Sequence, residues 1–552
     1  MKIAIAQLKY KIGDVKYNKL KFLEYFKKAE KDKVDLVIFS ELALTGYPPK
    51  DLLLQDAFLD EIGKAIDKIA EATKKSKTSI LLGTPFLLPK QNVDGIVKRE
   101  ILYNSAILIE EGYIGELAHK NTISNKADFN EHSYFARSMN LRVASIKNKN
   151  FVILISDDIY NTKNLFLLKD RKFDGVIVIG SSYFEENKQE ERFRVCSKAA
   201  KVLGKPIIFA NCVGGQDSLI FDGDSFVINK MGEYILRLND FEEDYRIIET
   251  VKKSKELEFV ENHTKKQDVN KYEKMYNAAV LGLRDYMKKS GLKKAIVGLS
   301  GGIDSATTTL VTTDTIGSKN LILVNMPSRF SSDHSKSDSL EIANNLGVKL
   351  KTLEIEPLFQ SFIENVKNIE GYTGFNLAEE NLQARIRANI LMYIANKENA
   401  LLVNTGNKSE NAVGYSTLYG DTCGGYAPIG DIYKTDVYKL AEWRNKNICK
   451  LSDFLKTNII PKNVFKKHPS AELRKDQKDS DSLPEYEILD EVLRLIIEKR
   501  KTAKELIHDG FDKKLVEKIY NLFKKSEFKR RQEPLCAKIS RITLGLDFDC
   551  SL

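Results

Sequence analysis

The stretch that decides the fold of this 552-residue chain is Gly298-Leu299-Ser300-Gly301-Gly302-Ile303-Asp304-Ser305. The apolar run Ala295-Ile296-Val297 precedes it, and Ala306-Thr307-Thr308-Thr309-Leu310 follows it. This order predicts a buried strand, a Gly/Ser turn and the start of a helix packed on a sheet. Glycines let backbone N–H groups approach a phosphate closely, and a helix N-terminus adds partial positive charge. The stretch therefore predicts a nucleotide site.

The acidic residue of this turn indicates which nucleotide chemistry to expect. The turn has no Gly-Lys-Ser/Thr sequence of the Walker type, which disfavours that class of γ-phosphate hydrolase. Asp304 lies where a carboxylate could hold Mg²⁺ against a pyrophosphate, because Mg²⁺ prefers one or two carboxylates plus phosphate oxygens. The pattern resembles the loop of pyrophosphate-releasing ATP enzymes, which adenylate a substrate. An ordinary Gly-rich turn between a strand and a helix is the alternative.

The composition excludes several classes of protein. Hydrophobic residues make up 42% of the chain, yet no apolar run approaches the length of a membrane span, and residues 1–6 predict a strand, not a signal peptide. The six cysteines form no Cys-x-x-Cys pair and no disulfide-like spacing, so we expect a reduced, cytoplasmic setting. The net charge of +10 comes from lysines mixed with acids, which predicts solvated helix faces and no nucleic-acid partner.

A polar, charged segment without periodicity separates two halves of the chain. We predict domains at residues 1–250 and 271–552, with 251–270 as linker. Strand-like apolar runs alternate with amphipathic segments in both halves, which favours parallel sheets covered by helices. The runs of the first half are residues 3–8, 36–39, 80–82, 151–155, 176–179 and 207–210, and those of the second are 295–298, 321–325 and 401–404. Residues 272–288 predict a helix, and residues 486–528 are helical in pattern.

Further polar clusters follow the predicted strands of the second half. Residues 325–332 supply hydroxyls and a guanidinium at a strand's C-terminal end, where ligands bind in open α/β sheets. Asn381 and Arg385 lie one turn apart on one face of a predicted helix. A second polar turn, residues 404–410, contains Thr405 and offers Glu410 as a further Mg²⁺ ligand. Each cluster alone fits a solvated loop, but together they favour one site.

In their order, these motifs resemble the synthetase domain of the NAD synthetase family. The matching segments are residues 298–305, 326–332, 381–387, 405–410, 419–421, 428–431, 469–473, 479–484 and 528–532. The resemblance implies a doubly wound parallel-sheet adenylating domain with a helical C-terminal part. It also implies the reaction: the carboxylate of deamido-NAD attacks the α-phosphate of ATP, pyrophosphate leaves, and ammonia displaces AMP from the acyl-adenylate to give NAD.

The same resemblance implies roles for individual residues. The turn Gly298 to Ser305 and Thr405 would contact ATP, Asp304 and Glu410 would hold Mg²⁺, and deamido-NAD would be contacted by Asn381, Glu410 and Lys529. Developing phosphate charge requires such cationic and N–H partners.

The first half resembles the nitrilase-like amidases, in the version fused to NAD synthetases. Glu41 lies in the motif of residues 39–47, Lys120 lies in His119-Lys120-Asn121-Thr122, and residues 211–217 and 221–226 also match. The resemblance implies an αββα sandwich in which Glu, Lys and Cys hydrolyse glutamine through a thioester and pass ammonia to the synthetase. It assigns Glu131 as the secondary acid and Ser182 and Lys188 as glutamine contacts. It also implies a homo-oligomer, at least a dimer.

The nucleophile is where the first half departs from that family. The family has Cys-Glu-Asp after the strand at residues 151–155, and this chain has Ser156-Asp157-Asp158. A serine hydroxyl is far harder to deprotonate than a thiol. No cysteine precedes Cys196, so no chain neighbour replaces the thiol. Lys126 stands where the family has a glutamine-contacting Tyr, and residues 180–183 read GSSY in place of Asn-Ala-Ser-Pro.

Several changes of this kind favour natural loss of the glutaminase over a single laboratory Cys-to-Ser change. We therefore expect free ammonia to be the working donor. Three alternatives stay open at this point. Glutamine is still used, with Ser156 an engineered or weakly competent nucleophile. The protein is an RNA-modifying adenylating enzyme, which the absence of a Cys-x-x-Cys metal site and of a basic, aromatic RNA-binding segment disfavours. Or the chain is a catalytically dead scaffold, which the intact turn at residues 298–305 opposes.

Overall fold

The computed structural model describes residues 1–88, 92–93, 96–97, 101–126, 128–251, 256–260, 270–369 and 371–548, and only the backbone at 92–93, 96–97, 116 and 126. The chain forms two compact units. The first unit comprises Met1–Gly214 and Phe221–Asp268, and the second comprises Gly215–Ile220 and Val269–Leu552. Residues 252–255 and 261–269 of the expected linker lie outside the described residues, so the linker stays a prediction. No helix in the described ranges has both the length and the apolar character that a membrane span requires.

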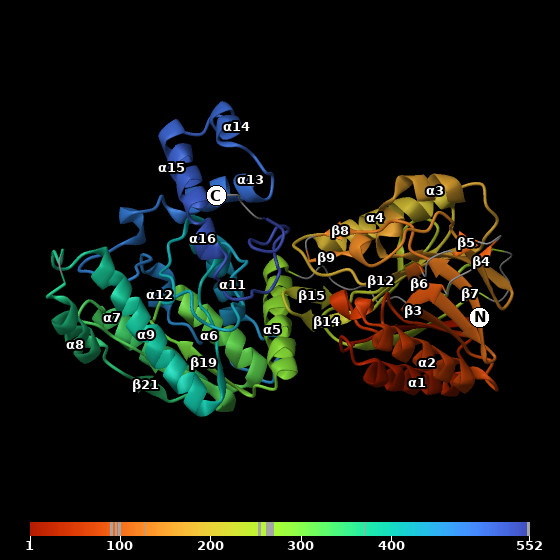
Figure 1. The fold of residues 1–552 in the computed structure, drawn as a ribbon, viewed down its shortest axis with the longest axis horizontal. Coiled ribbons are helices and arrows are strands. Elements are labelled where there is room, and N and C mark those ends of the chain that lie inside the picture. Colours follow the sequence, from red (N-terminus) through yellow and green to blue (C-terminus); the bar gives the residue numbers. More distant parts are fainter. Residues whose placement is uncertain are drawn as a thin grey trace. The chain divides into compact units, whose positions relative to one another are not determined.

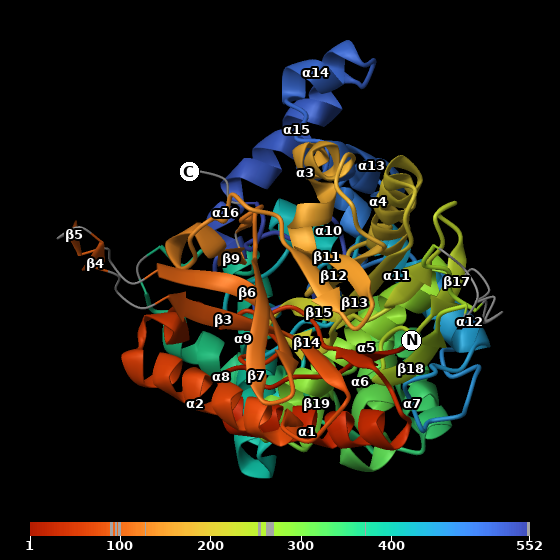
Figure 2. The same ribbon diagram turned by 90° about the vertical axis from the view of Figure 1, so that its right-hand side faces the viewer.

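The first unit is a sandwich of two sheets between two layers of helices (Figures 1 and 2). The order of strands in one sheet is β18 (Asp244–Glu249), β1 (Lys2–Gln7), β2 (Leu36–Ile38), β3 (Ser79–Leu88), β6 (Ile101–Glu110) and β7 (Tyr113–His119). In the other it is β10 (Val143–Ile146), β11 (Lys149–Ile155), β12 (Gly175–Gly180), β13 (Ile207–Asn211), β16 (Phe226–Ile228) and β17 (Tyr234–Arg237). Helices α1 (Val15–Lys31) and α2 (Asp56–Thr73) cover the first sheet, and α3 (Thr162–Leu168) and α4 (Lys188–Leu203) cover the second.

Three apolar cores hold these layers together. Phe22 and Phe26 of α1 pack with Phe39 and Ile80 under the first sheet. Alternate residues of β1 and β11, such as Ile3 and Ile153, meet in the core between the two sheets. The other faces of β11 and β12 pack against α4. Central strands buried on both faces read as continuous apolar runs, which is why they were visible in the sequence.

The sheets of the first unit are mixed, whereas the alternating pattern favoured parallel sheets. Strands β1, β2 and β3 are parallel, as are β11, β12 and β13. The outer strands β18, β6, β7, β10, β16 and β17 pair antiparallel. These strands are joined by hairpins or come from distant parts of the chain. They are therefore not separated by a segment long enough for a helix, which is the spacing that would indicate their pairing. Short pairs also form between β4 (Asn92–Val93) and β5 (Ile96–Val97), and between β8 (Asn125–Lys126) and β9 (Phe129–Asn130).

The second unit is built on a parallel sheet, as expected. Its strand order is β21 (Leu350–Thr352), β20 (Leu321–Asn325), β19 (Lys294–Gly298) and β22 (Ala400–Leu402). Helices around it are α5 (Lys271–Ser290), α6 (Ile303–Ile316), α7 (Asp333–Leu346), α8 (Glu356–Val366), α9 (Leu377–Glu398), α10 (Lys408–Val413), α11 (Lys434–Lys446) and α12 (Lys462–Lys466). The hairpin of β14 (Val213–Gln216) and β15 (Leu219–Asp222) has residues in both units.

Residues 486–528, which the sequence pattern predicts to be helical, overlap four helices in the structure. They are α13 (Tyr486–Ile497), α14 (Ala503–His508), α15 (Lys513–Lys525) and α16 (Glu527–Arg530). Leu489, Val492 and Leu493 of α13 pack with Ile519 and Phe523 of α15 in one core. This core also includes Ala412 and Val413, and it therefore fixes α10, the helix that contains Glu410.

Candidate functional site

A cavity of about 320 Å³ opens at the C-terminal ends of β19, β20 and β22. Residues 298–300 and 302–305 line it, together with Thr405 and Glu410 from the second predicted turn. Arg387 of α9, Lys434 of α11 and residues 467–473 complete its wall. Parallel strands direct their C-terminal ends to one edge, so the polar turns that follow them meet there.

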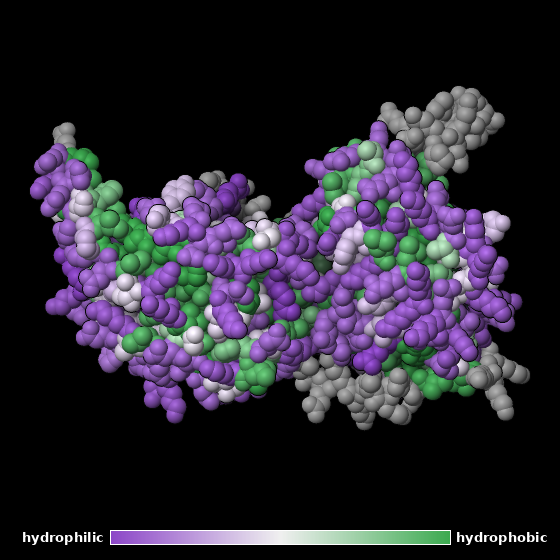
Figure 3. Space-filling model, turned by 90° about the horizontal axis from the view of Figure 1, so that it is seen from below, coloured by the Kyte–Doolittle hydropathy of each residue, from purple (hydrophilic) through white to green (hydrophobic). Residues whose placement is uncertain are grey.

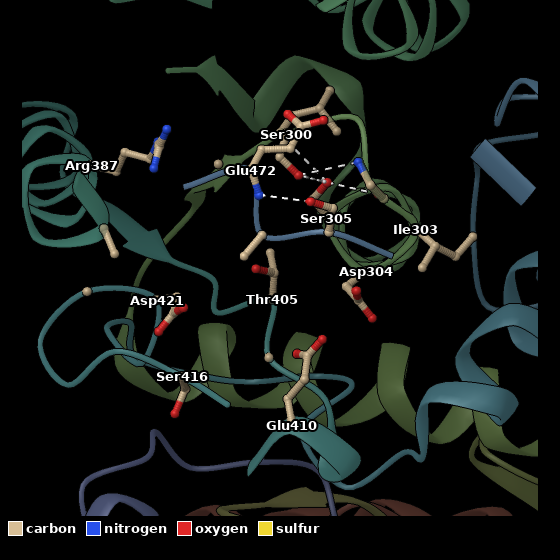
Figure 4. Close-up of a pocket in the computed structure, with 18 of the residues that line it drawn as sticks. Ser300, Ile303, Asp304, Ser305, Arg387, Thr405, Glu410, Ser416, Asp421 and Glu472 are labelled. Carbon is tan, nitrogen blue, oxygen red and sulfur yellow. Dashed lines mark hydrogen bonds between the residues drawn. The ribbon is translucent and has the colours of Figure 1, made fainter. Parts of the chain in front are cut away.

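The turn between β19 and α6 has the geometry expected of an anion cradle. Gly301 has a φ of +84°, and a Cβ there would lie 2.3 Å from the carbonyl oxygen of Ser335. Only glycine fits this position, because the φ and the close backbone both exclude a side chain. Ser305 accepts a hydrogen bond from the Ser300 backbone N–H at 3.2 Å, and the two hydroxyls lie 3.1 Å apart (Figure 4). The N-terminus of α6 thus faces the cavity.

The two predicted metal ligands are brought together and share a lysine. Asp304 and Glu410 point toward one another in Figure 4. The Lys434 ammonium donates to Asp304 Oδ2 at 2.5 Å and to Glu410 Oε1 at 3.0 Å. Asn407, the N-cap of α10, donates to Asp304 Oδ1 at 3.0 Å. The lysine side chain is 3% exposed, whereas each carboxylate side chain is 18% exposed toward the cavity.

Burial controls the ionisation of this cluster. Desolvation raises the pKa of Glu410 to about 8, with Asp304 and Asp479 adding to the shift and Lys434 opposing it. The lysine is desolvated as well, but the charges of Asp304 and Glu410 outweigh this and hold the pKa of Lys434 above its usual value. When both carboxylates are ionised, Asp304 and Glu410 carry one negative charge more than Lys434 compensates, and a bound divalent cation would relieve this excess. Two carboxylates that border a cavity with room for phosphate oxygens are a ligand set that would suit Mg²⁺.

Of the residues assigned to deamido-NAD, Glu410 lines the cavity, whereas Asn381 and Lys529 contact the loop at residues 414–417 behind its lining. Asn381 Oδ1 accepts from the Thr417 hydroxyl at 2.7 Å, and Asp421 holds the Thr417 backbone N–H at 2.5 Å. Lys529 donates to the carbonyl oxygens of Gly414 and Ser416, at 2.8 and 2.6 Å. Ser416 and Asp421 line the cavity, so the Lys529 ammonium stands directly behind its wall. Burial lowers the pKa of Lys529.

Several titratable groups of the cavity received no role from the sequence, and Lys434, Arg387 and Glu533 are three examples. Lys434 follows a matching segment closely in the chain, but its contact with Asp304 spans 130 residues. Arg387 is half-buried in the wall of the cavity, and desolvation lowers its pKa to about 10. Burial raises the pKa of Glu533 to about 8, with Asp421 and Glu410 contributing. Arg387 was visible as a second arginine at i+2 from Arg385, but nothing in the local pattern marked Glu533.

The first unit brings Glu41, Lys120 and Glu131 together in its interior. Lys120 Nζ lies 2.9 Å from Glu41 Oε1 and 2.8 Å from Glu131 Oε2, and all three side chains are at most 1% exposed. Asn104 donates to Glu41 Oε1 at 2.8 Å, and the Ser181 backbone N–H donates to Glu41 Oε2 at 3.0 Å. Glu41 and Glu131 raise the pKa of Lys120 well above its usual range, although burial opposes them.

Ser156 follows β11 directly and begins the short 3-10 helix η3 (Ser156–Tyr160). Its φ of +45° lies in the left-handed region, which is costly for a residue other than glycine and is often found at functional sites. Within the described residues, the structure shows no hydrogen bond between the Ser156 hydroxyl and Glu41 or Lys120. The turn at Ser156 is therefore strained, and among the described residues its hydroxyl shares no hydrogen bond with Glu41 or Lys120.

The predicted glutamine contacts are placed around this turn. Ser182 exchanges hydrogen bonds with the Asn211 amide, both at 2.9 Å. Lys188 begins α4, with its ammonium 5.2 Å from the ring centre of Tyr160. The side chain of Lys126 lies outside the described residues. No sequence pattern places Cys212 near this site, yet its sulfur lies 3.6 Å from the Ser181 hydroxyl. Burial raises the pKa of the Cys212 thiol to about 12. It stays protonated and offers no thiolate.

Comparisons with known proteins agree with both halves of this description. The NAD synthase family profile matches residues 275–533, and the carbon-nitrogen hydrolase profile matches residues 2–254. A "Glutamine-dependent NAD(+) synthetase" of Synechocystis sp. is 39% identical to this chain, over 98% of this chain and 97% of the length of the relative. One of Aquifex aeolicus is 35% identical, over 99% of this chain and 98% of its own.

Two solved structures extend the likeness to the fold. The glutamine-dependent NAD+ synthetase of Acinetobacter baumannii, solved in complex with ADP, has a TM-score of 0.78 and 35% identity, covering 99% of this chain and 97% of its own. The enzyme of Cytophaga hutchinsonii has a TM-score of 0.80 at 20% identity, covering 99% and 96% of the two chains. The chain belongs to the glutamine-dependent NAD(+) synthetases, a family of ligases.

Proposed function

We propose that this chain makes NAD from deamido-NAD and ATP with free ammonia as its working nitrogen donor. The observation that supports this is the contrast at Ser156. The cavity of the second unit has its turn, its two carboxylates and its cations in place. The first unit has Glu41 and Lys120 in place, but at position 156 it has a hydroxyl with no hydrogen bond to either.

The groups of the cavity suit the formation of an acyl-adenylate. The N–H groups of the turn at residues 298–305 and the N-terminus of α6 would hold ATP phosphates. Asp304 and Glu410 would hold Mg²⁺, which when bound neutralises charge on phosphate oxygens. Lys434 already bridges both carboxylates and would remain beside the leaving pyrophosphate. Asn381 and Lys529 would fix the deamido-NAD side of the cavity through Thr417 and the loop at residues 414–416.

Ammonia is the nitrogen source that this arrangement leaves available. Thioester chemistry needs a thiolate, and a thiol can be ionised by a nearby base. A serine hydroxyl needs a base in contact with it, and both Glu41 carboxylate oxygens are already engaged by Lys120, Asn104 and Ser181. Loss of a nucleophile commonly costs an enzyme several orders of magnitude in rate.

Initial rates of NAD formation test the proposal. Deamido-NAD, ATP and magnesium are supplied with either ammonium or glutamine as the nitrogen source. We expect ready turnover with ammonium and almost none with glutamine. Comparable rates with the two donors would overturn the proposal. A failure with both donors would contradict NAD synthesis by this chain.

Glutamine use through Ser156 is the second candidate, and one observation favours it. The Glu41–Lys120–Glu131 cluster is complete, and Ser156 keeps a strained turn after β11. On this alternative the unaltered chain hydrolyses glutamine, and Ser156→Cys alone raises that activity by orders of magnitude. If the glutamine pocket has also changed, at Lys126 and residues 180–183, Ser156→Cys restores little.

We further propose that the chain forms a homo-oligomer, at least a dimer, through its second unit. Figure 3 shows apolar side chains at the surface of both units, the second included. Large exposed apolar side chains are concentrated on α8, α9 and the segment between them: Leu358, Phe362, Ile369, Phe375, Leu377 and Tyr393. Exposed apolar side chains that gather into a patch commonly mark interaction surfaces.

Light scattering checks this assembly. Leu377→Asp with Tyr393→Asp should lower the molar mass of the particle, because buried charges oppose association. Phe166→Asp, at a side chain equally exposed on α3, is the matched control and should leave the mass unchanged. A monomeric unaltered chain would contradict the assembly.

A further inference from the structure

We propose that Asp490 is a positioning residue for the cavity of the second unit. It caps the start of α11 from outside that helix and so fixes Lys434 against Glu410. This inference deepens the proposed function and rests on it, because it takes Asp304 and Glu410 as the residues that would hold Mg²⁺. It assigns a role to a residue of α13, to which the sequence assigned none.

Helix α11 begins without a capping side chain of its own. Its N-cap residue is Tyr433, which makes no side-chain hydrogen bond to the first turn. The first N–H groups of a helix have no partner inside the helix, so they need acceptors from elsewhere. The Lys434 N–H donates to the Ser409 hydroxyl at 2.9 Å, and the Thr435 N–H donates to Asp490 Oδ2 at 2.8 Å. These acceptors come from two other helices, α10 and α13.

One buried carboxylate joins the three helices. Asp490 Oδ1 accepts from the Ser409 hydroxyl at 2.5 Å, and Oδ2 accepts from the Thr435 hydroxyl at 2.7 Å as well as from its N–H. Burial raises the pKa of Asp490, and these hydrogen bonds and the charge of Arg494 oppose the shift. The carboxylate is thus paired on both oxygens, and it links the first turn of α11 to α10.

The residues that Asp490 holds are direct chain neighbours of the charged groups of the cavity. Ser409 precedes Glu410, and Thr435 follows Lys434. Lys434 Nζ lies 3.0 Å from Glu410 Oε1, so a shift of α11 against α10 would change this contact. Asp490 itself is 2% exposed and lies outside the cavity lining. It therefore acts through the two helices and does not touch a substrate.

The test separates binding of the cation from binding of the nucleotide in the full-length chain. Calorimetric titration gives the dissociation constant of ATP with magnesium and with EDTA, and deamido-NAD is left out so that no adenylate forms. The ratio of the two constants is the factor by which magnesium tightens ATP binding. We expect Asp490→Ala to lower this factor about tenfold, because loss of a group that holds a metal ligand in place commonly costs about 10–100-fold in metal affinity. An unchanged factor would overturn the proposal, even if both constants rise, since an equal rise is what a general loss of packing predicts.

Ser409→Ala tests the same link with a smaller change. It removes one hydroxyl and should lower the factor by less than Asp490→Ala does. In the double variant Ser409→Ala/Asp490→Ala, the loss should be clearly smaller than the product of the two single losses, because the two residues act through one link. A loss equal to that product would overturn the proposal. If Asp490→Ala disturbs folding, as checked by circular dichroism, Ser409→Ala alone must still lower the factor.

The matched control for Ser409→Ala is Tyr276→Phe. The Tyr276 hydroxyl also donates to a buried carboxylate of the second unit, that of Asp314, at 2.6 Å. Asp314 pairs with Arg444, which lies near the opposite end of α11 from Lys434. We expect Tyr276→Phe to leave the factor unchanged. A fall equal to that of Ser409→Ala would also overturn the proposal, because it would show a general effect of loosening α11.

The outcome is separable from that of the proposed function. ATP binding does not depend on which nitrogen donor the chain uses, so glutamine-driven NAD formation would contradict the ammonia proposal and leave the role of Asp490 standing. If magnesium does not tighten ATP binding to the unaltered chain, the assignment of Asp304 and Glu410 fails, and the role of Asp490 fails with it. If magnesium tightens ATP binding equally in the unaltered chain and in Asp490→Ala, only the role of Asp490 is removed.

Discussion

The two units contain the same local arrangement, a buried lysine between two acidic side chains, but in different surroundings. In the first unit Lys120 lies between Glu41 and Glu131, with all three side chains closed off from solvent. In the second unit Lys434 lies between Asp304 and Glu410, whose carboxylates are each 18% exposed toward a cavity of about 320 Å³. Both lysines have raised pKa values because of their acids, although burial opposes the shift.

The difference lies in what the charged cluster can act upon. The cluster around Lys434 faces space lined by N–H groups and hydroxyls, where a polyanion and a cation can replace its internal pairing. The cluster around Lys120 is closed off from solvent and, among the described residues, shares no hydrogen bond with the Ser156 hydroxyl. A preserved set of charges is thus no guarantee of activity, because catalysis needs the reacting group in contact with them. Substitutions of individual residues test this difference.

The largest expected effect is at Asp304. Asp304→Ala should leave folding intact and reduce pyrophosphate release from ATP and deamido-NAD by at least about 100-fold, because pyrophosphate charge would lose a compensating cation. Release is measured with a coupled pyrophosphate assay. Asp333→Ala, at an exposed side chain of α7, is the control and should retain full activity. Normal release by Asp304→Ala would remove the assignment of the second cluster.

A smaller effect is expected at Lys529. Because its ammonium stands behind Ser416 and the cavity wall, Lys529→Ala should raise the KM for deamido-NAD by about tenfold, equal to about 1.4 kcal/mol, and the KM for ammonium much less. Steady-state kinetics with each substrate varied in turn measure the two constants. Lys525→Ala, on the exposed end of α15, serves as the comparison. Equal and small changes in both constants would favour a solvated role for Lys529.

The smallest expected effect is on stability, at Glu533. Burial raises its pKa to about 8 in the folded chain, above the value of about 4.3 for an unfolded Glu. The folded state therefore binds the proton more tightly. The stabilisation from the neutral carboxyl is complete below the unfolded pKa and is lost as the pH rises through about 8. Glu533→Gln keeps the neutral form at every pH.

Urea unfolding of the unliganded protein checks this. Glu533→Gln should be more stable than the unaltered chain by about 1–2 kcal/mol near pH 8. The gain should shrink toward zero below about pH 4, where Glu533 is neutral in both the folded and the unfolded chain. Glu517→Gln, an exposed substitution on α15, should show no such pH dependence. A gain that is independent of pH would contradict the raised pKa of Glu533.

Much of the central fold was predictable because buried parallel strands are continuous apolar runs. Strands β11, β12 and β19 were all found within one or two residues of their observed bounds. Edge strands were not. Asp244–Glu249 is largely polar in sequence, and it becomes β18 only by pairing with β1 at the start of the chain. A strand that owes its existence to a distant partner leaves little local pattern.

The candidate sites divide in the same way. Asp304 and Glu410 follow strands of one parallel sheet, so their proximity could be argued from topology. The contact of Lys434 with both spans 130 and 24 residues and comes from the packing of α11. Cys212 and Ser181 are brought together by the pairing of β12 with β13. Their contact could not be predicted, because no local sequence pattern shows which strands are neighbours.

The measurement that tests the central claim most directly is a competition between the two nitrogen donors. The unaltered chain is given deamido-NAD, ATP, magnesium, ordinary ammonium and glutamine labelled with ¹⁵N in its amide, at equal concentrations of the two donors. Mass spectrometry then reports which donor supplied the amide of the NAD formed. We expect NAD with almost no ¹⁵N. Predominant labelling would show that the amidase site of Glu41, Lys120 and Ser156 works, and would contradict the account.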